Sequence, residues 1–154
     1  MTHQDYMRQA LALAQEAAAA GEVPVGCVIV DKDGQVIGRG RNRREEEKNP
    51  LAHAELDAIA DACRRYGDWR LKGARLYVTL EPCPMCAGGI ISARIPEIYY
   101  GAKDAGFGAC GSILNLFEED FRHHPKIVGH ILEAECAALL RDFFAQVRGK
   151  EMQT

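Results

Sequence analysis

Two short stretches of the sequence combine residue types that bind a metal ion with one that can move protons. Residues 53–55 read His-Ala-Glu, and residues 82–86 read Pro-Cys-Pro-Met-Cys. Zinc takes nitrogen and sulfur ligands tetrahedrally, and a catalytic zinc site keeps its fourth position for water or substrate. The imidazole of His53 and the thiolates of Cys83 and Cys86 supply the other three positions. The two stretches together therefore predict a catalytic Zn²⁺ site.

Glu55 adds a carboxylate beside this metal site. It lies two residues after His53, so it is expected to handle protons rather than to be a ligand. Zinc lowers the pKa of a bound water toward neutrality, and a nearby carboxylate can take the proton and pass it to a substrate. A carbon that carries an amine leaving group is a natural target for such a pair. Glu55 is therefore the expected catalytic residue.

The elements that must position these residues follow from hydrophobic patterns and turn signals. Apolar runs predict strands at residues 23–30, 35–42, 75–80, 97–101 and 126–131, with an Asp33-Gly34 hairpin turn after the first. Helical stripes predict helices over residues 7–18, from 56 to about 67, after Pro84 and over 133–147. Both metal-binding stretches then open a helix, where the positive end of the helix dipole favours thiolates. This order predicts an α/β fold, a five-stranded mixed sheet between two helical layers.

Each of two predicted helices has an apolar face that is expected to point into the core. In the helix after His53, this face consists of Leu56, Ile59, Ala60 and Cys63. In the closing helix, the face consists of Cys136, Leu140, Phe143, Phe144 and Val147. Cys27, Cys63 and Cys136 are accordingly interpreted as core thiols.

Composition and length limit the classes of protein that remain. The chain of 154 residues, with 47% hydrophobic and 27% charged residues, is expected to form one domain over residues 1–154. Six cysteines without a secretory signal indicate metal ligands and free thiols in a reducing cytoplasm. No apolar run is long enough for a membrane span. A net charge of -3 gives no general attraction to nucleic acid.

The pattern His-x-Glu followed by Pro-Cys-x-x-Cys is the signature of zinc nucleobase deaminases. Beyond this signature, the chain resembles the bacterial tRNA-specific adenosine deaminase (TadA) family over nearly its whole length. The stretches that carry the resemblance are residues 22–26, 40–42, 52–55, 79–87, 101–104, 111–112, 135–140 and 142–144. The signature is shared with cytosine and guanine deaminases, and the segments from Lys103 onward favour the tRNA branch.

The resemblance implies a cytidine deaminase-like three-layer αβα fold, with Zn²⁺ on the three ligands and Glu55 as the proton shuttle. It also implies that Asn42 hydrogen-bonds the purine and that the backbone around Ala54 contacts the base edge. Asp104 would lie next to a ribose of the tRNA anticodon loop, and Phe144, with Phe143, would form part of the wall around the looped-out nucleotides. Members are homodimers that deaminate adenosine to inosine at the wobble position, 34. An unpaired loop base suits this chemistry because it is reached at little unstacking cost.

Some residues keep a second interpretation. Asn42 also suits a turn at a strand end, and Asp104 is ambiguous in the same way. Arg39, Arg41, Arg43 and Arg44 form either an RNA-facing ridge or a surface that pairs with the acidic residues 45–47.

Two other functions remain beside the tRNA deaminase. One is a free nucleobase or nucleoside deaminase for cytosine or guanine on the same fold, which the negative charge favours. The other is a non-catalytic, zinc-stabilised binding module, which requires a closed site with a fourth protein ligand.

Overall fold

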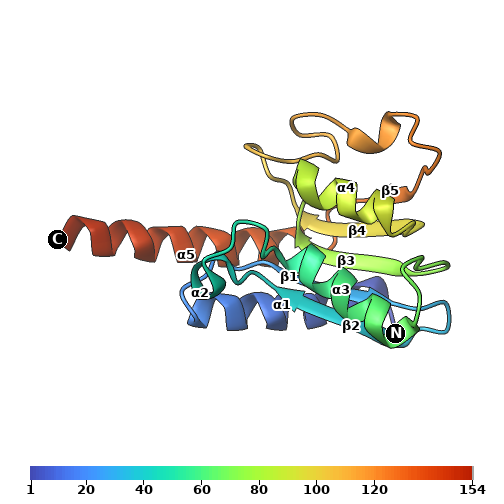
Figure 1. Ribbon diagram of the computed structural model, residues 1–154. Coiled ribbons are helices and arrows are strands. Elements are labelled where there is room, and N and C mark those ends of the chain that lie inside the picture. Colours follow the sequence, from blue (N-terminus) through green and yellow to red (C-terminus); the bar gives the residue numbers. More distant parts are fainter. Residues whose placement is uncertain (154) are drawn as a thin grey trace.

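A five-stranded mixed sheet lies at the centre of the fold, with helices on both faces (Figure 1). The computed structural model describes the backbone of residues 1–153 and the side chains of residues 1–150. Its elements, in chain order, are α1 (His3–Ala19), β1 (Gly26–Val30), β2 (Val36–Arg41), α2 (Arg44–Glu47), α3 (Ala54–Tyr66), β3 (Arg75–Leu80), α4 (Pro84–Ser92), β4 (Glu97–Ala102), η1 (Leu116–Glu118), β5 (Lys126–Val128) and α5 (Glu133–Gln153). The predicted α/β sheet between helical layers is confirmed.

The strand order is β2-β1-β3-β4-β5. β1 pairs antiparallel with β2 and β3, whereas β3, β4 and β5 run parallel. The hairpin between β1 and β2 closes at the predicted turn, where the Gly34 N–H donates to the Asp31 carbonyl and Gly34 has a φ of 87°. Because β3 and β4 are parallel, their carboxyl ends meet at one edge of the sheet. Both α4 and the segment after β4 begin at that edge.

The two faces of the sheet bury separate hydrophobic clusters. α3 and α4 cover one face, where they pack on alternate side chains of β1, β3 and β4. α1 and the start of α5 cover the other face, which includes the stacked rings of Tyr77 and Tyr99. β1 is therefore buried along its whole length, as expected for a strand that is covered on both sides.

The face of α3 that packs on the sheet differs from the predicted one. The buried residues are Ala54, Glu55, Ala58 and Ala62, whereas Ala60 is exposed and the larger apolar side chains are only partly buried. A Cβ at Gly38 or Gly40 of β2 would collide with the backbone of α3. Two glycines opposite three alanines thus let α3 approach the sheet closely. This pairing of small residues decides which face of α3 packs on the sheet.

The closing helix also departs from the expected burial. Only Cys136 of its predicted inward side chains is buried, and Phe144 is 42% exposed. Figure 1 shows the reason, because the second half of α5 extends beyond the sheet and has no layer to pack against. Within residues 1–153, no helix combines the length and the apolar content that a membrane crossing requires.

Candidate active site

The ends of two helices bring the metal-binding residues together. His53 is the N-cap of α3, and Cys83 is the N-cap of α4, whose first turn holds Cys86. Pro84 occupies the first turn of α4, where its missing N–H costs no hydrogen bond. The His53 Nδ1 atom lies 3.7 Å from the Cys83 sulfur and 3.5 Å from the Cys86 sulfur. Residues 30 positions apart in the chain thus meet at one point.

These distances fit a tetrahedral zinc ion. With Zn–N near 2.0 Å and Zn–S near 2.3 Å, two ligands at the tetrahedral angle lie about 3.5–3.8 Å apart. The three ligand atoms all lie within 4.8 Å of one another, and among the described residues no fourth His, Cys, Asp or Glu joins the cluster. The donor set therefore fits a zinc site with three protein ligands and one open position.

Burial and hydrogen bonding set the charges at this cluster. A hydrogen bond with Cys86 lowers the pKa of the Cys83 thiol to about 4, and the same contact raises the pKa of Cys86. Burial raises the pKa of the Glu55 carboxyl to about 7. Glu55 is 4% exposed and lines the pocket beside the cluster. A carboxyl in this range exchanges protons readily near neutral pH.

Asn42 connects β2 to the start of α3. Its Oδ1 accepts the Ala54 N–H at 3.0 Å, and its Nδ2 donates to the Val23 carbonyl at 3.1 Å. These two partners fix the orientation of the amide and leave one N–H and one lone pair free. Asn42 therefore both caps the end of the strand and lines the pocket.

Ala54 lies at the first turn of α3, next to the Asn42 amide. Its side chain is fully buried, and its N–H is taken by Asn42. Ala54 thereby helps to orient the Asn42 amide, which lines the pocket, and contact between the backbone around Ala54 and a base stays a prediction.

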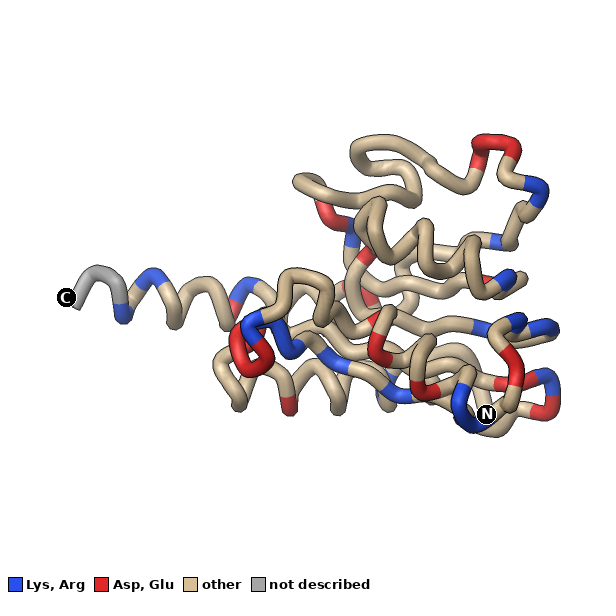
Figure 2. The backbone as a smooth tube through the Cα atoms, viewed as in Figure 1, with Lys and Arg blue, Asp and Glu red and all other residues tan. Residues whose placement is uncertain are grey.

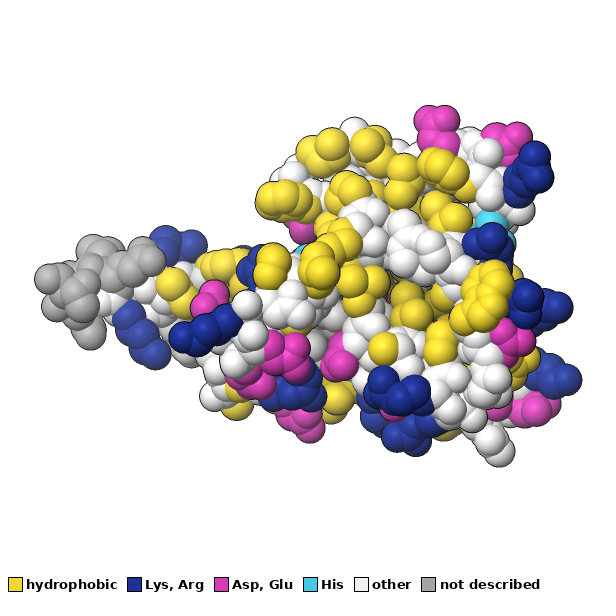
Figure 3. Space-filling model, viewed as in Figure 1, with side chains coloured by type: hydrophobic (Ala, Val, Ile, Leu, Met, Phe, Trp, Pro, Cys, Tyr) yellow, Lys and Arg dark blue, Asp and Glu magenta, His cyan; other side chains and the backbone are white. Residues whose placement is uncertain are grey.

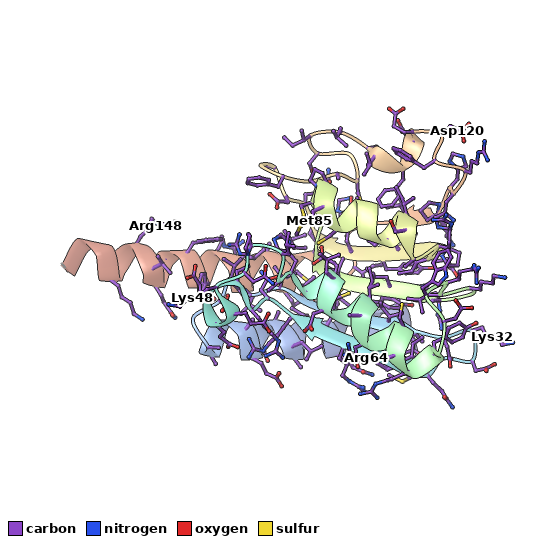
Figure 4. The ribbon with its side chains drawn as sticks, viewed as in Figure 1. Lys32, Lys48, Arg64, Met85, Asp120 and Arg148 are labelled. Atoms are coloured by element: carbon purple, nitrogen blue, oxygen red, sulfur yellow. The ribbon has the colours of Figure 1, made fainter. Side chains whose placement is uncertain are left out.

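One pocket of about 690 Å³ opens beside the cluster, a size typical of ligand sites. It brings together His53, Glu55, Cys83, Asn42, Asp104 and Phe144 from the predicted set. Its other walls are Val23, Val25, Arg44, Leu80, Glu81, Pro84, Met85, Lys103, Ala105, Phe107 and Leu140. Figure 4 places the labelled Met85 at the start of α4, on this side of the sheet.

The arginine side chains near α2 divide between the two interpretations. Arg41 pairs with Glu46 at 2.9 Å, and Arg43 reaches Glu46 at 3.5 Å and Asp57 at 3.4 Å. A basic stretch accordingly lies next to an acidic one in this part of the chain (Figure 2). Arg44 instead lines the pocket.

Sequence reasoning placed Arg44 on a possible RNA-facing ridge, but it missed Lys103 and Glu81 as pocket residues. Arg44 and Lys103 put positive charge at the pocket wall, and Glu81 also lines the pocket and is 2% exposed. Of the two missed residues, only Glu81 carried a usable signal, as a carboxyl residue between an apolar strand and the Pro-Cys motif. A charge at such a place is buried only when it is hydrogen-bonded.

Comparison with known proteins agrees with this geometry. Residues 1–102 match the family described as "Cytidine and deoxycytidylate deaminase zinc-binding region". The tRNA-specific adenosine deaminase of Bacillus subtilis (strain 168) is 45% identical over 147 residues, which cover 95% of this chain and 91% of the relative. The cytidine deaminase-like fold is thereby confirmed.

Solved structures resemble the chain as well. One, from a study of A-to-I editing by tRNA:A34 deaminases at the wobble position of transfer RNA, has a TM-score of 0.84 and 45% identity, and the match covers 88% of this chain and 99% of that one. A guanine deaminase from Bacillus subtilis has a TM-score of 0.64 and 40% identity, with 70% and 72% of the two chains covered.

Proposed function

Because the chain belongs to the tRNA-specific adenosine deaminase family of zinc-binding deaminases, we propose that it hydrolyses adenosine to inosine at the wobble position, 34, of a tRNA. The observation that carries this proposal is the continuous pocket. It runs from the three-ligand cluster and Glu55 to a wall that holds Arg44 and Lys103. Positive charge beside a base-sized site suits a nucleotide within a phosphate backbone. We propose residues 1–154 as one deaminase domain; Thr154 lies outside the described residues.

His53, Cys83 and Cys86 would hold the zinc ion. When bound, zinc acts as a Lewis acid that activates water at neutral pH. Glu55 would accept a proton from the attacking water and deliver it to N1 of adenine while C6 is attacked. A second proton would reach the departing amine through the same carboxylate. Water is consumed, ammonia leaves, and inosine remains.

The residues around the cluster would orient the nucleotide. Asn42 lines the pocket, and its free N–H and lone pair would suit the edge of a purine. Asp104 uses Oδ1 to accept the N–H groups of Gly106 and Phe107, so Oδ2 is the atom left to meet a ribose hydroxyl. The Phe144 ring, exposed on α5, would stack beside an unpaired base.

The decisive assay measures inosine in an anticodon stem-loop that carries adenosine at the wobble position. We expect zinc-dependent conversion of this stem-loop and none of adenine, adenosine, cytosine or guanine supplied free. Ammonia release from the free compounds is measured in parallel. Conversion of a free base with an inert stem-loop would reject the tRNA assignment and leave the zinc chemistry in place.

Guanine or another free base is the second candidate substrate. It is favoured by the 40% identity to a guanine deaminase and by the ion pairs that neutralise Arg41 and Arg43. The zinc-stabilised binding module is disfavoured, because the cluster of the described residues has three ligands rather than four.

We also propose a homodimer in the cytoplasm. All six cysteines are free, which suits a reducing compartment. Large apolar side chains are exposed in the segment between β4 and β5, including Phe107 at 70%, Ile113 at 60% and Phe121 at 50%. In Figure 3, hydrophobic side chains gather over this segment and α4. Such a patch is typical of an interface.

The dimer predicts a molar mass in solution of twice the 17.0 kDa of the chain. Light scattering after gel filtration measures it. Ile113→Asp should shift the mass toward that of the monomer, because it places a charge in the apolar patch. A monomeric wild-type protein at assay concentration would contradict the dimer.

A further inference from the structure

The mechanism above makes no use of the Glu81 carboxylate, which is buried between β3 and α4. It accepts four hydrogen bonds, all from one segment, residues 104–112. Oε1 accepts the Asp104 N–H at 3.1 Å and the Ser112 hydroxyl. Oε2 accepts the N–H groups of Cys110 at 2.9 Å and Ser112 at 3.1 Å. This segment is called the 104–112 loop below.

The carboxylate and the loop depend on each other. A buried charge is costly unless hydrogen bonds satisfy it, and the four donors fill the accepting capacity of a carboxylate. Without the carboxylate, three partly buried backbone N–H groups of the loop would lose their partner, and a buried N–H group needs one. Every buried side-chain polar atom in the described part of the chain has one.

The loop is tied closely to the chain around Glu81. The Ala109 N–H donates to the Pro82 carbonyl at 2.8 Å, and the Gly108 N–H donates to the Asp104 carbonyl at 2.9 Å. A Cβ at Gly108 would collide with the Glu81 carboxylate and the Asp104 carbonyl oxygen. The loop backbone therefore packs directly on the carboxylate, without a side chain between them.

Glu81 connects this loop to the metal cluster through very little chain. Its own N–H donates to the Ala102 carbonyl at 2.8 Å, which holds it to the end of β4, and Cys83 follows two residues later. Asp104 and Phe107 both belong to the anchored loop and line the pocket. Glu81 thus helps to fix the position of this pocket wall relative to the cluster.

We propose that Glu81 is a positioning residue, whose buried carboxylate holds the 104–112 loop as the substrate-binding wall of the pocket. All four hydrogen bonds of its carboxylate come from the loop, and it acts through Asp104 and Phe107. The role in substrate binding rests on the proposed function, whereas the anchoring of the loop does not.

The test compares Glu81→Gln with wild type and with Glu97→Gln. The glutamine keeps the size of the side chain but turns an NH₂ group toward N–H donors. Glu97 is a carboxylate at the opposite end of β4 that accepts the Tyr99 hydroxyl at 2.6 Å and does not line the pocket. Three quantities are measured: amide hydrogen exchange, bound zinc, and kcat and KM on the stem-loop.

We expect Glu81→Gln to speed exchange across residues 104–112 by about 10-fold, since an unsatisfied buried donor has an effect of this order. KM should rise by about 10-fold, with zinc content retained and kcat changed by less than about 3-fold. Glu97→Gln should leave all three unchanged. Ser112→Ala, which removes one donor of the four, should give a smaller change in the same direction.

Unchanged exchange in the 104–112 loop would overturn the proposal, and so would faster exchange with an unchanged KM. If wild type leaves the stem-loop unreacted, the proposed function fails by itself. The KM comparison then uses whichever free base or nucleoside wild type converts. If Glu81→Gln fails to fold, Ser112→Ala serves as the test, with the same measurements of hydrogen exchange and KM.

Discussion

Glu55→Gln is expected to retain zinc and to lose nearly all turnover. Glutamine has nearly the same size, so the packing of α3 against the sheet and the three-ligand cluster should persist. It cannot accept and return a proton, and general acid–base groups contribute about 10²–10⁴-fold to rate. We expect kcat on the stem-loop to fall by about 10³-fold or more while KM stays within a few-fold. Single-turnover inosine formation and metal analysis measure the two effects.

Glu47→Gln is the matched control for this variant. Glu47 is an exposed carboxylate of α2 that does not line the pocket, so its loss should change kcat by less than about 2-fold. Full turnover by Glu55→Gln with normal zinc content would show that another group moves the protons. Loss of zinc from this variant would instead show that Glu55 supports the ligands.

Removal of the metal is expected to abolish activity and to destabilise the fold. The ligands lie at the starts of α3 and α4, so zinc joins two helices that the chain connects only through β3. An ion present at about 1000 times its Kd adds about 4 kcal/mol to the free energy of unfolding. We expect a chelator to reduce turnover to background and to lower Tm, and added Zn²⁺ to restore both.

Cys86→Ala should reproduce these losses irreversibly, because a site with two ligands no longer holds the ion. Cys63→Ala is the control. Cys63 is a half-buried thiol of α3 outside the cluster, so zinc content and kcat should stay at wild-type values. Activity that survives complete removal of zinc would contradict the proposed chemistry.

The sequence by itself determined most of the local structure that carries the site. Strands and helix starts depend on neighbouring residues, so the apolar runs, the Asp33-Gly34 turn and Pro84 predicted them. The types and spacing of His53, Cys83 and Cys86, at the starts of two helices, also predicted a three-ligand cluster. The structure brings these three residues together.

Only the tertiary structure decided which side chains are buried and which charged residues pair. The packing face of α3 depends on Gly38 and Gly40 of a different element. The second half of α5 keeps its side chains largely exposed because it extends beyond the sheet. Arg43 is neutralised by Asp57 across 14 positions, and Glu81 meets Ser112 across 31. Helix and strand propensities are local, whereas hydrogen bonds to a buried charge join whichever segments the topology places side by side. The zinc chemistry can therefore be predicted from the sequence, whereas the hydrogen bonds that hold the pocket wall in place cannot.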